Sequence, residues 1–144
     1  MWSKNGFQQP LLDGVNPLPA EYTSKGDIWE VSVRAYDGES FSSNTQQTTF
    51  TVENSLPTIS INELPANISF VQSELLGLEV VPEFSDLDDD QINSTIHWQR
   101  NGFREGSLDN ATFVPAAYFG AGQTWTLLIS YHDNDGPIQQ ESWT

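Results

Sequence analysis

The sequence predicts an all-β fold of β-sandwich repeats in tandem, on three observations. The chain repeats itself: "WSKNGF" begins at Trp2 and "WQRNGF" at Trp98, an offset of 98 − 2 = 96 residues. At this offset 12 of the 36 positions from 2 to 37 are identical without a gap. The segment Ile28–Tyr36 alternates apolar and polar side chains, as a half-buried strand does. Asn-Gly, Asp-Gly and Pro turn signals separate short segments that have no helical period.

The length of the period indicates repeated whole domains, because the repeats of solenoids run to roughly 20–50 residues. The chain enters the first repeat in its middle, and Glu53–Pro57 has the polar, proline-containing composition of a linker. By analogy with Thr48–Val52, we expect the second repeat to lack its last strand. The predicted organisation is about one and a half repeats, with residues 1–54 forming the C-terminal part of the first repeat and residues 55–144 the second.

Each expected strand is a short apolar or alternating segment between turn signals. In chain order they are Ile28–Tyr36, Thr48–Val52, Thr58–Ile61, Ile68–Val71, Leu76–Glu83, Thr95–Arg100 and Thr124–Tyr131, with a weaker strand region at 108–114. Domains of about 100 residues built from such strands favour an immunoglobulin-like, Greek-key sandwich, in which Trp98 lies on the third strand. We expect the repeated aromatic residues to pack in the two cores: Trp2, Trp98, Trp29, Trp125, Tyr22 and Tyr118.

The composition excludes several partners. Five Lys and Arg residues against 20 Asp and Glu residues give a net charge of −15, which repels nucleic acid and anionic membrane surfaces. The chain has no cysteine, so disulfides and thiolate metal sites are excluded and the redox compartment stays open. No apolar run approaches the roughly 20 residues that span a bilayer, so no membrane insertion is expected in this segment. The acidity suits a saline environment and an ordinary acidic secreted domain equally well.

The order of the repeated motifs resembles a known family. "W-x-[KR]-N-G", "[LV]-P-A-x-Y", "K-G-D" before a Trp-led strand, "A-Y-D-G" and the "E-N-x-x-P" linker are similar to the tandem immunoglobulin-like or cadherin-like repeats of large bacterial and archaeal surface proteins. The second repeat departs from the pattern, with "AGQ" in place of "KGD". The resemblance implies an extracellular, cell-surface protein with a structural or adhesive role, as a stalk, a spacer or the subunit of a surface filament.

The richest chemical motif is the D-x-D-x-D series formed by Asp86, Asp88 and Asp90. Closely spaced carboxylates repel one another unless a cation or solvent intervenes, so the series predicts either a calcium loop or a solvated acidic turn. It is not an EF-hand, which would place glycine and glutamate where Gln91 and His97 stand.

Topology adds further acidic residues to this loop. In an immunoglobulin-like sandwich, the pole that carries the Asp86 loop also receives the "HDNDG" loop and the linker. We therefore expect Asp133, Asp135 and Glu53 to join the site. The resemblance to cadherin-like repeats implies calcium at such a junction, where it would stiffen the array, with oxygen ligands alone.

No motif assembles a nucleophile with a base, so we expect no enzymatic activity. Three Asn-x-Ser/Thr patterns, at Asn67, Asn93 and Asn110, are either glycosylation acceptors or chance occurrences. The main functional hypothesis is the structural or adhesive segment, and the alternative is a carbohydrate-binding or accessory module of a secreted enzyme. The expected partners are neighbouring repeats or copies of the chain, by way of strand exchange, or a surface glycan or protein. The strands missing from the first repeat would come from the parent chain or from such exchange.

Overall fold

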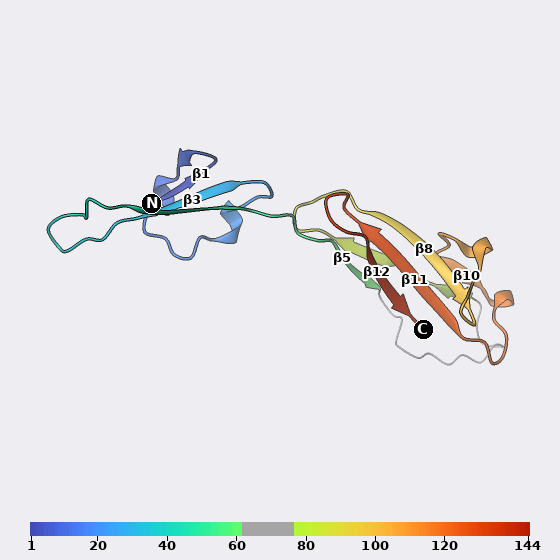
Figure 1. Ribbon diagram of the computed structural model, residues 1–144. Coiled ribbons are helices and arrows are strands. Elements are labelled where there is room, and N and C mark those ends of the chain that lie inside the picture. The colour runs from blue at the N-terminus through green and yellow to red at the C-terminus, as the bar shows by residue number, and fades with distance from the viewer. Residues whose placement is uncertain (62–76) are drawn as a thin grey trace. The chain divides into compact units, whose positions relative to one another are not determined.

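The computed structural model describes residues 1–61 and 77–144 (Figure 1). The chain divides into two compact units, Met1–Ser55 and Leu56–Thr144, and the division falls one residue after the expected repeat boundary. Both units consist of short antiparallel strands joined by turns and single-turn 3₁₀ helices. The prediction of an all-β protein is therefore confirmed. Among the described residues, no helix has the length and apolar character needed to cross a membrane.

The first unit holds one four-stranded antiparallel sheet with the strand order β2-β1-β3-β4. Its strands are β1 (Trp2–Lys4), β2 (Phe7–Gln8), β3 (Ile28–Val33) and β4 (Gln46–Thr51). The 3₁₀ helices η1 (Pro10–Leu12) and η2 (Ala20–Tyr22) interrupt the long connection between β2 and β3. Trp29 and Leu12 are the buried apolar side chains of this unit.

The second unit contains a four-stranded sheet of order β12-β11-β8-β9 and two two-stranded sheets, β5-β7 and β10-β6. The first sheet consists of β8 (Asn93–Arg100), β9 (Phe103–Arg104), β11 (Trp125–His132) and β12 (Gln139–Trp143). The smaller sheets consist of β5 (Thr58–Ile61), β6 (Gly77–Glu79), β7 (Pro82–Ser85) and β10 (Phe113–Pro115). Two 3₁₀ helices, η3 (Gly106–Leu108) and η4 (Ala116–Tyr118), flank β10.

The core of the second unit lies between these sheets. Its buried members are Val80, Ile96, Trp98, Leu108, Val114, Leu127, Ile129 and Tyr131. Half-buried side chains of β5, β6 and β7 pack against this cluster: Ile59, Ile61, Leu78 and Phe84. Because alternate residues of β11 point inward, the burial of Leu127, Ile129 and Tyr131 follows from the period-two pattern of the sequence.

The repeated "N-G" forms the same clamped hairpin in both units. In the first, Asn5 and the following glycine have φ of 51° and 82°, the left-handed pair that a tight hairpin turn requires. The Asn5 backbone N–H donates to the Ile28 carbonyl (2.7 Å), and the Ile28 N–H donates to Asn5 Oδ1 (2.8 Å). Asn101 and Thr124 make the same two bonds in the second unit, at 2.7 and 2.9 Å. The motif therefore joins the turn to the start of the Trp-led strand.

The repeated tryptophan that opens each motif has a second structural role. Trp2 Nε1 donates to the Val15 carbonyl (3.0 Å) and Trp98 Nε1 to the Ala111 carbonyl (2.9 Å), again 96 residues apart. Each indole N–H thus holds the long connection against its sheet, which satisfies a donor that would be costly to bury alone.

Two expectations about aromatic burial need correction. Trp98 and Trp29 are buried, but Trp125 is only half-buried: it packs against the buried cluster from outside it, with its ring beside that of Phe119 (5.1 Å between centroids). Tyr22 is exposed, since the single-turn helix that carries it presents no buried side chain. Trp2 and Tyr118 are half-buried.

The strand expectations also change in detail. The segment Leu76–Glu83 is not one strand, because β6 ends at Glu79 and β7 begins at Pro82. The expected strand Ile68–Val71 lies outside the described residues. The second repeat was expected to lack its last strand, yet β12 pairs with β11 as β4 pairs with β3. The segment QQESWT at 139–144 resembles QQTTFT at Gln46–Thr51, but at an offset of 93 residues, so the ungapped offset of 96 did not reveal it.

Candidate functional site

Three carboxylates meet at one end of the second unit. One oxygen each of Asp86, Asp90 and Asp133 lies within 4.8 Å of the other two. Asp86 and Asp90 belong to the loop between β7 and β8, and Asp133 follows the last residue of β11. The predicted convergence of the two loops therefore occurs, and the three side chains together could hold a metal ion.

The backbone of its own loop holds Asp133 in place. Its Oδ1 accepts hydrogen bonds from the backbone N–H groups of Asp135 (3.0 Å) and Gly136 (2.8 Å), and the residue is only 4% exposed. The same turn exists in the first unit, 96 residues earlier. There Asp37 Oδ1 accepts from Glu39 N–H (2.9 Å) and Ser40 N–H (2.8 Å). The turn is thus a general element of the repeat, and the carboxylate cluster is an addition to it.

Asp86 organises the other loop in the same manner. Its Oδ1 accepts from the backbone N–H groups of Asp88 (2.7 Å) and Asp90 (3.3 Å). Its Oδ2 is buried from solvent and has no hydrogen-bond partner among the described residues. A buried carboxylate oxygen without a partner carries a desolvation cost, and two neighbouring carboxylates raise that cost. A bound cation would offset both.

The other three predicted ligands, Asp88, Asp135 and Glu53, are not members of this group of three. Asp88 and Asp135 contribute backbone N–H groups to the two loops, and their carboxylates are outside the group of three. Glu53 is exposed and belongs to the first unit. The D-x-D-x-D spacing could not distinguish these roles, because the turn brings the carboxylates of Asp86 and Asp90 into the group but not that of Asp88.

The glycosylation patterns have two described acceptors. Asn93 and Asn110 are both exposed, as a modified asparagine must be. Asn110 Oδ1 accepts from the Ile96 backbone N–H (3.0 Å), which leaves its amide nitrogen as the group that a glycan would take. Asn67 lies outside the described residues.

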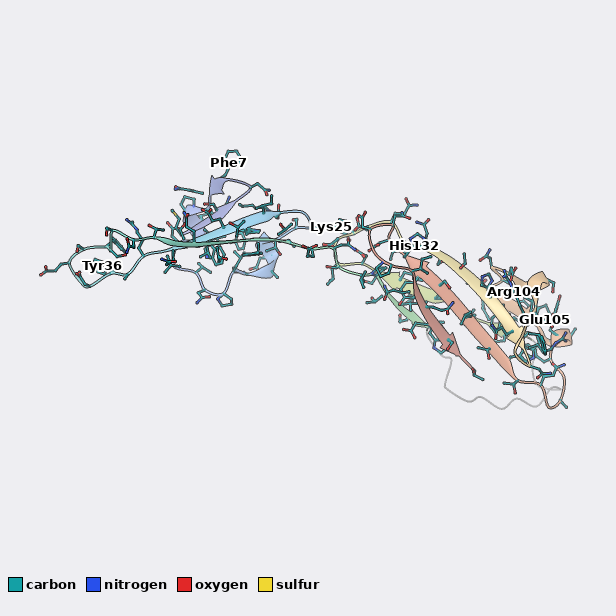
Figure 2. All side chains as sticks on the ribbon, in the orientation of Figure 1. Phe7, Lys25, Tyr36, Arg104, Glu105 and His132 are labelled. Atoms are coloured by element: carbon teal, nitrogen blue, oxygen red, sulfur yellow. The ribbon has the colours of Figure 1, made fainter. Side chains whose placement is uncertain are left out.

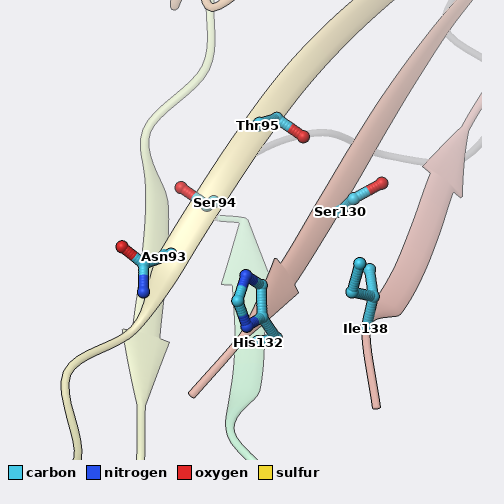
Figure 3. A pocket seen from close by; sticks show the side chains of 6 residues that line it. All are labelled: Asn93, Ser94, Thr95, Ser130, His132 and Ile138. Atoms are coloured by element: carbon cyan, nitrogen blue, oxygen red, sulfur yellow. The ribbon is translucent and has the colours of Figure 1, made fainter. Parts of the chain in front are cut away.

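Figure 3 shows a shallow pocket beside the first of these acceptors. Its lining comes from the start of β8, the end of β11 and the residue before β12: Asn93, Ser94, Thr95, Ser130, His132 and Ile138. The cavity measures about 130 Å³ and opens to solvent. His132 Nδ1 accepts from the Asn134 backbone N–H (3.2 Å), so the ring is fixed against its own loop. The pocket offers hydroxyl and amide groups but is smaller than the sites that enclose small ligands.

Sequence reasoning missed a charged pair in the first unit. Lys4 Nζ lies 2.6 Å from Asp27 Oδ2, and the Ser24 backbone N–H donates to the same oxygen (2.7 Å). The hydrogen bond from Lys4 is the main reason that the pKa of Asp27 falls below its ordinary value of 3.8. In the second unit Gln123 Oε1 accepts from the Gly120 N–H (2.8 Å) in place of Asp27. The last residue of "K-G-D" and the last residue of "AGQ" therefore play the same role, which is to close the loop by accepting a backbone hydrogen bond. The only sign of this role in the sequence is that the two residues occupy equivalent positions in the repeats.

A second charged group lies on β8 and β9. Arg104 donates to both oxygens of Asp109, from Nε (3.0 Å) and from the guanidinium end (2.6 Å). His97 Nδ1 lies 3.1 Å from the same carboxylate. The Arg104 hydrogen bonds and, to a lesser extent, that of His97 lower the pKa of Asp109. Both histidine and carboxylate are therefore occupied by structural contacts.

An exposed aromatic pair occupies the β3–β4 connection. Tyr36 and Phe41 have ring centroids 4.8 Å apart, and the Arg34 guanidinium lies 4.8 Å from the centre of the Phe41 ring. Both rings are more than half exposed. Figure 2 shows Tyr36 on this connection, away from the sheet. Exposed rings beside a cation can serve as a binding platform.

Comparison of the chain with protein-family models, with curated proteins and with solved structures gives no match.

Proposed function

We propose that the chain is a non-enzymatic, calcium-binding segment of an extracellular repeat protein, built from immunoglobulin-like sandwiches. The observation that carries the proposal is the buried, unpartnered Asp86 Oδ2 beside the carboxylates of Asp90 and Asp133. The strand order β12-β11-β8-β9 supports the sandwich, because one sheet of that fold also places its last two strands beside its third strand, and the pairs β5-β7 and β10-β6 supply strands for the opposite sheet.

Calcium fits this group better than other common metals. The donors are carboxylate oxygens alone, which favours a hard cation over zinc or copper. Calcium accepts six to eight oxygens in flexible geometry, and waters or backbone carbonyls complete such a shell. Magnesium requires a strict octahedron and retains its waters. Three acidic ligands suit the weak sites of extracellular modules, whose dissociation constants are about 0.1–1 mM. The exposed Asn93 and Asn110 acceptors agree with the same location.

Thermal unfolding with added calcium tests the proposal. At a hundredfold excess over the dissociation constant, calcium adds about 2.7 kcal/mol to the free energy of unfolding, and a chelator removes it. Because the chain carries a charge of −15, any salt relieves some repulsion, so KCl at matched ionic strength is the reference. A melting temperature that responds equally to both salts would contradict the proposal.

The repeat itself supplies the matched control. Asp133→Asn removes a carboxylate of the cluster, whereas Asp37→Asn changes the equivalent turn in a unit that lacks the cluster. We expect the first substitution to abolish the calcium response and the second to preserve it. Equal loss in both variants would show that the response belongs to the turns and not to the three carboxylates.

One observation favours the alternative function. The Tyr36–Phe41 pair places two tilted, solvent-exposed rings side by side, and exposed rings are what a carbohydrate-binding module uses. If this alternative holds, soluble polysaccharide retards the chain in affinity electrophoresis and Phe41→Ala abolishes the retardation. If acidic, neutral and basic polysaccharides all leave the mobility of the unmodified chain unchanged, the carbohydrate-binding alternative is refuted.

A further inference from the structure

One face of the first unit is open where the equivalent face of the second unit is covered. Along β3 the side chains of Trp29, Val31 and Val33 share this face, because alternate residues of a strand point the same way. Phe50 of β4 is the cross-strand neighbour of Trp29, so it lies on the same face. Trp29 itself is buried, and we call Val31, Val33 and Phe50 the open face.

Beyond Trp29, which is buried while its counterpart Trp125 is half-buried, burial at equivalent positions shows the difference. Val33 is 59% exposed, and its counterpart Ile129 is 0% exposed. Val31 is half-buried, and its counterpart Leu127 is 2% exposed. The same holds for Leu18, which is half-buried, while Val114 is fully buried. The sequences at these positions are equally apolar, so the difference arises from what packs against them.

The covering elements in the second unit are β5, β6 and β7. Val80, between β6 and β7, belongs to the buried cluster with Leu127 and Ile129, and Ile59 and Phe84 pack against it. Strand β6 also pairs with β10 through Leu78 and Val114. The described residues of the first unit include no counterparts of these three strands.

We propose that the open face binds the opening strands of another repeat of this type, a strand segment with the pattern of β5 to β7. The donor is not the resident segment of a second copy. Each chain has two such faces and, among its described residues, one such segment, so a copy that donates it uncovers its own second unit and gains nothing. The proposal rests on the tandem-repeat part of the proposed function and is independent of calcium.

The decisive experiment supplies the segment at its natural spacing. Because Trp98 is equivalent to Trp2, residues 56–97 placed directly before Trp2 reproduce the connectivity of the second unit. We expect the β3 amides of this extended chain to exchange with deuterium at least tenfold more slowly than in the original chain, since burying one valine corresponds to about that factor. Extension by residues 93–97 alone lengthens β1 without covering the face, and it should leave β3 exchange unchanged.

Substitutions on the two faces of β3 test the site itself. Val33→Asp lies on the open face and Ile28→Asp on the opposite one, and the two native side chains are similarly exposed, at 59% and 50%. Val33→Asp should cancel the protection gained by the extended chain, whereas Ile28→Asp should retain it. Neither side chain is buried in the original chain, so both variants should fold.

A second arm uses the unextended chain with a synthetic peptide of residues 56–86. Saturable 1:1 binding that protects β3 supports the proposal, and a peptide with Ile59→Asp and Phe84→Asp should not bind. Protection of β11 in place of β3 would overturn it, because the peptide would then exchange with the resident segment. Concentration-dependent dimers of the chain alone that Val33→Asp abolishes would identify a second copy as the occupant and also overturn it. If neither the extended chain nor the peptide slows the exchange of the β3 amides while the calcium response persists, this inference is refuted and the proposed function still stands.

Discussion

Replacement of Trp98 by alanine is the sharpest test of the core of the second unit. The side chain is 2% exposed, lies between the sheets in the buried cluster, and donates its indole N–H to the Ala111 carbonyl at 2.9 Å. Truncating a buried tryptophan to alanine costs about 3–5 kcal/mol. Because whole domains are stable by only about 5–15 kcal/mol, this loss brings the second unit close to unfolding.

Trp98→Phe separates the two contributions. Phenylalanine keeps most of the apolar volume but leaves the Ala111 carbonyl without its donor, so the expected cost is about 1–3 kcal/mol. Phe103→Ala is the matched control, because Phe103 is an aromatic residue of the adjoining strand β9 that is 78% exposed, and its removal should cost less than about 0.5 kcal/mol.

Hydrogen exchange of the β11 amides is the appropriate assay, because it reports on the second unit alone. Tryptophan fluorescence would combine signals from both units. The reasoning fails if Trp98→Ala changes β11 exchange no more than Phe103→Ala does. It also fails if Trp98→Phe is as damaging as Trp98→Ala, because the indole N–H and not packing would then carry the stability.

Two further predictions concern the repeated loops. Asn101→Ala removes the acceptor of the Thr124 N–H and should destabilise the second unit by about 1–2 kcal/mol in urea unfolding, whereas Asn101→Asp, which keeps an acceptor, should cost less. Acid should destabilise the first unit through Asp27, whose pKa is lowered in the folded state chiefly by Lys4. That contribution is present above the ordinary pKa of 3.8 and disappears as the pH falls through the lower folded value. With Asp27→Asn, the protection of the β3 amides against hydrogen exchange should therefore fall less as the pH is lowered. The same loss of protection in the variant and the original chain would contradict the assignment.

The strands were the most predictable part of the molecule. Strand β5 has the expected bounds, and β3, β8 and β11 begin within two residues of the expected positions, because alternation and turn residues are local signals. The long apolar segment before Glu83 was harder to divide, since its break at Val80 depends on packing against the opposite sheet. Strand β12 was missed because its likeness to β4 occurs at an offset of 93 residues, and the repeat had been traced only at an ungapped offset of 96.

The candidate site was predictable as a meeting of loops but not as a set of ligands. The sequence indicated that the loops carrying Asp86 and Asp133 meet, and they do. Which carboxylates face one another depends on how each turn bonds its own backbone, as Asp86 does with Asp88 N–H. The Lys4–Asp27 contact joins β1 to the residue before β3, which is far away in the sequence, so no local pattern could reveal it.

The last strand has a mechanical consequence. Gln139, at the start of β12, donates from its side chain to the Pro57 carbonyl (2.8 Å), so the chain enters the second unit beside the beginning of its last strand. Thr144 follows the other end of that strand. Tension applied between Pro57 and Thr144 is therefore directed along β12, and it loads the ladder from Leu127–Trp143 to Tyr131–Gln139 in shear. Bonds loaded in shear must break together, whereas a strand pulled from one end would peel away bond by bond, so this geometry resists stretching of the second unit.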